Sequence, residues 1–98
     1  MTRRVIYSPR AVRWLRDQSE YLEQNRPAAV GRMWARLREA EAMLTDFPRI
    51  GRPTERPGIR RLTLRPYVLR YREISGGIEI VDIRHQRQAE RPLPPEDA

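Results

Sequence analysis

The segment RRLTLRPYVLRYREISGGIEIVDIRH, residues 60–85, decides the fold because it reads as three consecutive β-strands. Apolar and polar residues alternate along residues 60–65 and 67–74, which is the period of strands with one buried face. Ser75, Gly76 and Gly77 have the composition of a hairpin turn. Residues 78–83 are apolar on both faces, which predicts a central or bulged strand. The segment therefore predicts a mainly antiparallel sheet whose strand order the sequence leaves open.

Upstream of this segment, the sequence predicts a short strand followed by two helices. Residues 3–7 have strand character, and Ser8 then suits a helix N-cap with a proline at the first helical position. The helices are predicted over residues 9–24 and 27–45, because the residue before Pro27 avoids helical dihedral angles. The short link between them predicts an antiparallel helical hairpin. Residues 48–58 are rich in proline and glycine and are predicted to be a loop.

The element order βααβββ predicts an α+β fold of two layers, a helical hairpin packed on a mainly antiparallel sheet. Residues 1–88 form the predicted domain, and the proline-rich, acidic residues 89–98 are predicted to be disordered. If the leucines and tyrosines of the strands face the helices, the alternation places four arginines on the opposite, open face: Arg61, Arg65, Arg70 and Arg72. The alternative is a solvated face whose arginines pair with acidic residues of the same sheet: Glu73, Glu79 or Asp82.

Composition limits the chemistry of this 98-residue chain. Its net charge is +7, and all 20 basic residues are arginines. A surplus of guanidinium groups favours an anionic partner, either nucleic acid or an acidic protein, although a GC-rich coding bias also enriches arginine. The absence of cysteine excludes disulfides, thiolate nucleophiles and zinc–thiolate sites. With one histidine and no clustered carboxylates, we expect neither a metal site nor a cofactor.

Hydropathy favours a cytoplasmic protein without a membrane partner. The sequence has no long apolar run, and its arginine-rich beginning leads into charged sequence instead of an apolar signal segment. A helix-turn-helix spacing or a basic recognition helix is also missing, which argues against a plain DNA-binding domain.

Two longer stretches carry a family resemblance. RVIYSPRAVRWLRDQSEYL, residues 4–22, has an aromatic-Ser-Pro step leading from a strand into a helix. Residues 46–88 contain the loop FPRIGRP, a G-x-R-R-L step, a Y-x-x-x-Y-R strand, a glycine turn and a last strand ending near His85. In this order and spacing, the motifs resemble the RelE/ParE toxin superfamily of bacterial type II toxin–antitoxin systems, with ParE-type toxins the nearer branch.

The resemblance implies a growth-inhibiting toxin encoded beside a cognate antitoxin, part of which folds on the toxin and neutralises it. It also implies one of two targets. RelE-type members cleave mRNA in the ribosomal A site, whereas ParE-type members poison DNA gyrase and have no known nuclease chemistry. A third possibility is a module that has lost toxicity and only binds its antitoxin.

RNA cleavage requires a general acid, a general base and cations that stabilise the phosphorane. For a RelE-like ribonuclease, the candidate catalytic residues are Arg61, Arg70, Arg72 and His85. Ribonuclease members often add a C-terminal tyrosine, but residues 86–98 contain no aromatic residue. This departure favours gyrase inhibition over mRNA cleavage, so enzymatic activity is left as the alternative.

Binding residues follow from the same reasoning. We expect gyrase, or alternatively the ribosome and mRNA, to contact a set of arginines: Arg61, Arg65, Arg70, Arg72, Arg84 and Arg87. The antitoxin is expected to be acidic, since opposite potentials speed association. Trp14, Tyr21 and Trp34 are its candidate apolar anchors, although a small domain could equally use all three in its core.

Overall fold

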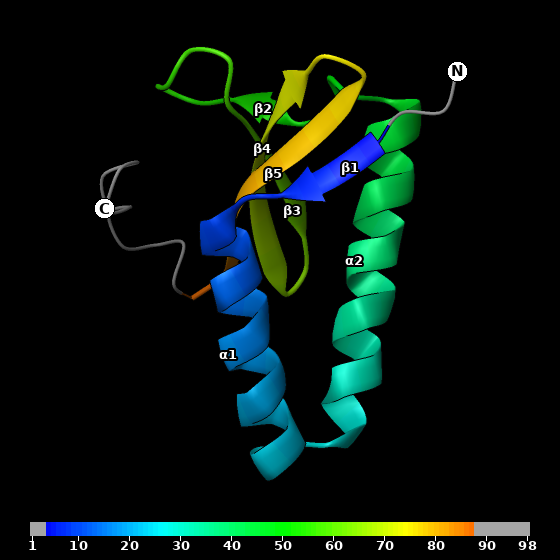
Figure 1. Ribbon diagram of the computed structural model, residues 1–98, viewed down its shortest axis with the longest axis vertical. Helices are drawn as coiled ribbons and strands as arrows, with labels where there is room; N and C mark the ends of the chain where they lie inside the picture. The colour runs from blue at the N-terminus through cyan, green and yellow to red at the C-terminus, as the bar shows by residue number, and fades with distance from the viewer. Residues whose placement is uncertain (1–3, 88–98) are drawn as a thin grey trace.

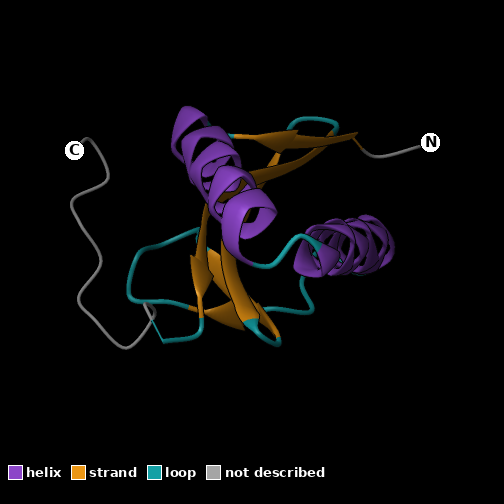
Figure 2. Ribbon diagram, turned by 90° about the horizontal axis from the view of Figure 1, so that it is seen from below, coloured by secondary structure: helices purple, strands orange, loops and turns teal. Residues whose placement is uncertain are grey.

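A five-stranded sheet and two helices make up residues 4–87, the part of the chain that the computed structural model describes. The elements are, in chain order, β1 (Arg4–Tyr7), α1 (Pro9–Asn25), α2 (Ala28–Asp46), β2 (Arg52–Pro53), β3 (Arg60–Leu64), β4 (Tyr67–Ile74) and β5 (Gly77–His85). Both helices pack against the same face of the sheet, and their connected ends extend past it (Figures 1 and 2). The predicted α+β fold is thereby confirmed. The tail predicted to be disordered, residues 89–98, lies outside the described residues.

The strands are arranged in the order β1-β5-β4-β3-β2. Every neighbouring pair is antiparallel except β1 and β5, which run parallel. The pairing of Arg70 with Asp82 and of Tyr71 with Ile80 leaves Val81 as the extra residue of a β-bulge. The strand predicted to be central or bulged therefore has both properties.

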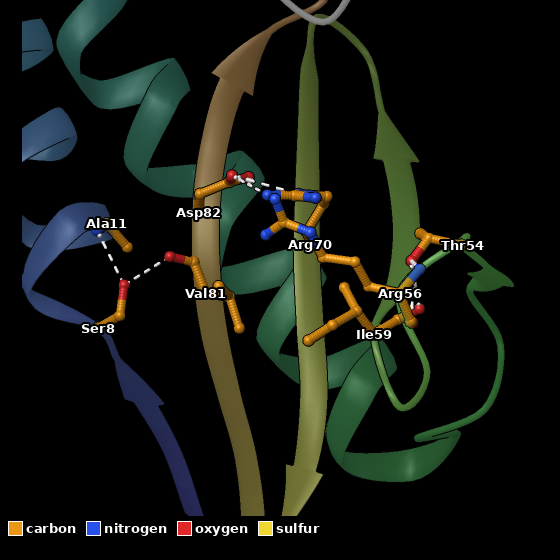
Figure 3. Close-up of polar contacts among 8 residues, drawn as sticks. All are labelled: Ser8, Ala11, Thr54, Arg56, Ile59, Arg70, Val81 and Asp82. Carbon is orange, nitrogen blue, oxygen red and sulfur yellow. Dashed lines mark hydrogen bonds and ion pairs between the residues drawn. The ribbon is translucent and has the colours of Figure 1, made fainter. Parts of the chain in front are cut away.

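Ser8 joins β1, α1 and β5. Its backbone N–H donates to Ile80 O at 2.9 Å, and its hydroxyl donates to Val81 O, in the bulge, at 2.5 Å. The same hydroxyl accepts a hydrogen bond from the Ala11 N–H at 3.1 Å, which makes Ser8 the predicted N-cap of α1 (Figure 3). One side chain thus fixes both the start of the helix and the position of the edge strand.

The core lies between the helices and the sheet. Tyr71 and Leu69, predicted to face the helices, are 0% and 1% exposed. On α1 the buried residues are Ala11, Leu15 and Leu22. Val12, next to Ala11, lies outside this buried stripe and is 42% exposed.

Two boundaries differ from the prediction. The loop predicted over residues 48–58 contains β2, which pairs with Arg60 and Arg61 of β3 through two residues only and is too short to leave a periodic pattern. The last strand begins at Gly77, which the sequence assigned to the hairpin turn, and it ends at His85 as predicted, where Arg84 and His85 pair with Val68 and Tyr67 of β4.

Candidate functional site

The register of the sheet sorts the candidate residues onto two faces. Side chains of directly paired residues point to the same face. The pairs Arg61–Arg70, Arg70–Asp82 and Val68–Arg84 therefore place three arginines and one aspartate on the face away from the helices. Tyr67 belongs to the core cluster, so its partner His85 lies on the helix side of the sheet.

On the open face, Arg70 and Asp82 form a buried ion pair. Nε and Nη2 of Arg70 both donate to Asp82 Oδ2, at 3.2 and 2.7 Å, and each side chain is 5% exposed (Figure 3). This arrangement differs from the expected display of Arg70 to solvent. Burial of both partners means that Arg70 is committed to Asp82, since a charge in such a place is tolerated only when it is paired.

A cavity of about 250 Å³ adjoins this ion pair. Residues 53–55 line one side of it, and Arg61 and Arg84 line the sheet side. The loop is held in place by the Thr54 hydroxyl, which donates to Ile59 O at 2.9 Å and accepts from the Arg56 N–H at 3.2 Å (Figure 3). We call this cavity the open-face pocket. The shape of the pocket depends on residues 53–55, and the alternation of residues in the strands could not predict where this segment lies.

Arg72 is also paired. Its Nε lies 2.7 Å from Glu79 Oε1, and its side chain is 53% exposed. The pairs predicted as the alternative to a bare arginine face, with Asp82 and Glu79, are therefore both present. The open face carries less positive charge than its arginine content indicates.

His85 does not join the arginines of the open face. Its ring lies edge-on to Tyr67, with the ring centroids 6.1 Å apart, and its Nδ1 accepts a long hydrogen bond of 3.4 Å from the Arg87 N–H. The four candidate catalytic residues are thus divided between two faces of the sheet. Arg61, Arg70 and Arg72 lie on one face and His85 on the other.

A second, larger cavity of about 800 Å³ lies between the helical hairpin and the turn from β3 to β4. Leu22, Met33 and Tyr67 contribute apolar surface to it. Five arginines line it together with His85: Arg26, Arg32, Arg36, Arg65 and Arg87. Among the described residues, no carboxylate lines this cavity, which we call the arginine groove. Burial raises the pKa of Tyr67, and the nearby charge of Arg32 opposes that rise.

Arg65 and Arg87 belong to the arginine groove and not to the open face. Arg65 was predicted to lie beside Arg61, but it occupies the turn after β3, where the alternation of the strand no longer applies. Arg26, Arg32 and Arg36 were missed entirely, because they come from the helical hairpin and not from the strands. The spacing of Arg32 and Arg36, four residues apart on one helix, was the one sequence signal that could have indicated a basic face.

A third cavity, of about 390 Å³, separates α1 from α2 on another side of the hairpin. Val12, Leu15, Trp34 and Leu37 line this apolar groove. At its β1 end, the Tyr7 hydroxyl donates to the carboxylate of Glu41. Burial and this hydrogen bond raise the pKa of Tyr7, so the tyrosine keeps its proton at physiological pH.

The three candidate anchors for the antitoxin are separated in space. Trp14 is half-buried and packs edge-on against Tyr67 at a centroid distance of 5.9 Å. Tyr21 is 57% exposed and lines the arginine groove, whereas Trp34 is 38% exposed and lines the apolar groove. The structure therefore leaves Tyr21 and Trp34 accessible and uses Trp14 largely for packing.

Residues 4–87 offer neither a membrane span nor a metal centre. No helix in this range is long and apolar enough to cross a membrane. Nor does the same range contain a group of three or more histidine, cysteine, aspartate or glutamate residues that could hold a metal ion.

Residues 5–90 match the family model described as the ParE toxin of the parDE type II toxin–antitoxin system. The Y4kP protein of Sinorhizobium fredii is 35% identical over 88 residues, which cover 88% of this chain and 91% of that protein. Toxin RelE2 of Caulobacter vibrioides is also 35% identical, over 81 residues, covering 83% and 92% of the two chains.

A solved structure titled "Chromosomal ParDE TA system from P. aeruginosa" contains a chain with the same fold. The TM-score is 0.70 at 24% identity, and the match covers 86% of this chain and 96% of that chain. The family model spans nearly the whole described structure, and the relatives match over most of their own length. The resemblance noted in the sequence is thereby confirmed, and the chain belongs to the ParE family of type II toxin–antitoxin toxins.

Proposed function

We propose that this toxin acts in the cytoplasm by inhibiting DNA gyrase and that a cognate acidic antitoxin neutralises it. The observation that carries the proposal is the division of the candidate catalytic set. A general acid or base must lie within hydrogen-bonding reach of the reacting group, together with the cations that stabilise the transition state. With His85 on the helix face and Arg61, Arg70 and Arg72 on the open face, no single RNA phosphate can meet all four. This division favours a toxin that acts by binding a target protein over one that cleaves RNA.

Ribosome-dependent cleavage of mRNA is the second candidate. The 35% identical relative named Toxin RelE2 and the presence of Arg61 and Arg84 at the open-face pocket favour it. Such a mechanism would have to work without His85, since that residue faces the helices.

The proposal predicts that the purified toxin inhibits DNA supercoiling by gyrase, or traps gyrase-cleaved DNA, while ribosome-bound mRNA stays intact. Supercoiling and A-site cleavage assays on the same preparation provide the measurement. Adding the antitoxin, sought as the product of the adjacent reading frame, should restore supercoiling. Cleavage of A-site mRNA that is lost in Arg61→Ala would reverse the ranking of the two targets. If neither target responds but the antitoxin still binds, the chain is an antitoxin-binding module without toxicity.

For the antitoxin we propose the helical hairpin as the binding surface. A segment that folds on its partner needs concave apolar surface and complementary charge. The arginine groove and the apolar groove offer these features, with Tyr21 and Trp34 exposed in them.

We expect Tyr21→Ala and Trp34→Ala each to weaken antitoxin binding by about tenfold or more, because exposed aromatic residues in grooves are frequent hot spots. Isothermal titration calorimetry with the antitoxin measures the effect. Phe47→Ala is the matched control, since Phe47 is exposed but lies outside both grooves. Unchanged affinity in both groove variants would place the antitoxin elsewhere.

A further inference from the structure

A row of arginines runs across three strands of the open face. Arg52 of β2 pairs with Arg61 of β3, and Arg61 pairs in turn with Arg70 of β4. Directly paired residues share a face of the sheet, so the three side chains start from neighbouring positions about 5 Å apart. Like charges placed directly opposite each other destabilise a sheet, and an anion bound beside them relieves the repulsion. Within the described residues, Asp82 at the β5 end of the row forms an ion pair with Arg70 alone.

Arg61, in the middle of the row, is an exposed cation at the open-face pocket. Among residues 4–87, no hydrogen bond or ion pair involves its guanidinium group. Arg61 therefore brings to the pocket a positive charge that the described part of the protein does not neutralise.

Asp82 occupies only one edge of the Arg70 guanidinium group. Nε and Nη2 both donate to Asp82 Oδ2, whereas Nη1 has no hydrogen-bond partner among the described residues (Figure 3). Nη1 is not sealed from solvent, because no sealed side-chain nitrogen or oxygen of a non-exposed residue in the range 4–87 lacks a partner. It is therefore reached through the open-face pocket, which Arg70 lines. A side chain that is only 5% exposed thus directs its remaining N–H donors into this pocket.

The free end of Arg70 and the neighbouring Arg61 form a site for one oxyanion. Guanidinium groups bind carboxylates and phosphates through pairs of charge-assisted N–H···O hydrogen bonds. Three arginines line the pocket together with two acidic residues, so the formal charges leave one positive charge in excess: Arg61, Arg70, Arg84, Glu55 and Asp82. A single monovalent oxyanion balances this excess.

The lining of the pocket favours a carboxylate over a phosphate of nucleic acid. Of the described residues that line it, none is aromatic, so a base would find no ring on which to stack. The carboxylates of Glu55 and Asp82 would repel a chain of phosphates. Pro53 and Val68, in contrast, offer apolar surface to the methylene groups of an acidic side chain.

We infer that the open-face pocket binds the carboxylate of an aspartate or glutamate side chain of the target protein, held by Arg61 and the free end of Arg70. The identity of the partner rests on the proposed function, which assigns the antitoxin to the grooves of the helical hairpin and leaves the open face to gyrase. The incoming carboxylate does for Arg61 what Asp82 does for Arg70.

The carboxylate site is tested on the full-length toxin alone. Acetate is titrated at constant ionic strength while the arginine Nε–H signals are followed by nuclear magnetic resonance. Acetate should shift the Arg70 signal in a saturable manner, and Arg61→Gln should weaken this binding by at least about tenfold. Arg49→Gln removes an exposed arginine outside the pocket and should leave acetate binding unchanged. The lack of a saturable shift would refute the site, and tighter binding of inorganic phosphate would favour nucleic acid as the ligand instead.

The identity of the partner is tested with gyrase. Arg61→Gln should raise the toxin concentration that inhibits supercoiling by at least about tenfold, with unchanged antitoxin affinity and melting temperature. Arg49→Gln should match the wild type in each assay. Gyrase inhibition that survives Arg61→Gln would refute gyrase as the source of the carboxylate, and a simultaneous loss of antitoxin affinity would assign the pocket to the antitoxin. If the wild-type toxin fails to inhibit gyrase while acetate still binds beside Arg70, the proposed function falls and the carboxylate site stands.

Discussion

Replacing Asp82 with alanine is expected to lower the free energy of unfolding by about 3–5 kcal/mol, because it leaves the Arg70 guanidinium buried without a partner. Both hydrogen bonds of this pair end on the same carboxylate oxygen, and each side chain is 5% exposed. Urea unfolding followed by circular dichroism at 25 °C measures the change. A loss of this size is a large fraction of the stability of a small domain.

Two control experiments test whether the loss of stability comes from leaving a buried charge without its partner. The double variant Arg70→Met/Asp82→Leu should recover most of the lost stability, since it removes both charges and keeps apolar volume. Glu79→Ala breaks the pair with Arg72, whose side chain is 53% exposed, and should cost no more than about 1 kcal/mol. If Asp82→Ala and Glu79→Ala had equal effects, the Arg70–Asp82 pair would not be isolated from water in solution.

Gly77→Ala is expected to destabilise the protein by about 3 kcal/mol through steric overlap between strands. Gly77 opens β5 directly opposite Arg4 of β1, and an added Cβ would lie only 2.0 Å from Arg4 O. A backbone atom cannot move aside as a side chain does, so β1 must shift away from β5. The hydrogen bonds of Ser8 to Ile80 and Val81 would be strained by the same shift. Thermal and urea unfolding report the loss.

Gly31→Ala is the matched control for this prediction. Gly31 lies on the exposed side of α2, and a Cβ there meets nothing within 4 Å. Alanine in a helix is more stable than glycine by about 1 kcal/mol, so this variant should gain stability. A similar loss in both variants would contradict the explanation by strand contact.

Local patterns in the sequence predicted most of the elements. The alternation of apolar and polar residues predicted which side of β3 and β4 faces the helices. The Ser8-Pro9 step predicted the start of α1. Both features depend only on residues that are close together in the chain. The bulge in β5 followed from its loss of alternation. The parallel pairing of β1 with β5 could not be predicted, since it depends on where the helical hairpin returns the chain.

The candidate sites were harder to predict, because they depend on how distant residues meet. Alternation placed Arg70 on the correct face, but only the register shows that Asp82 lies opposite it and that residues 53–55 line the cavity beside it. His85 was grouped with the arginines because RNA cleavage needs a general acid or base beside cations, although the pleat turns it to the other side of the sheet. The arginine groove combines α1, α2, the β3–β4 turn and the end of β5, which no single stretch of sequence records.

The position of β1 also bears on when the toxin becomes folded during synthesis. Ser8 bonds to a carbonyl 73 residues later in the chain, and β1 has no neighbour in the sheet other than β5. A ribosome therefore releases the first strand and both helices long before their last partner has been translated. Since domains complete their cores only when distant segments can meet, the sheet is expected to close at the very end of translation. A truncated chain that stops before β5 would then lack the folded surfaces through which the toxin acts.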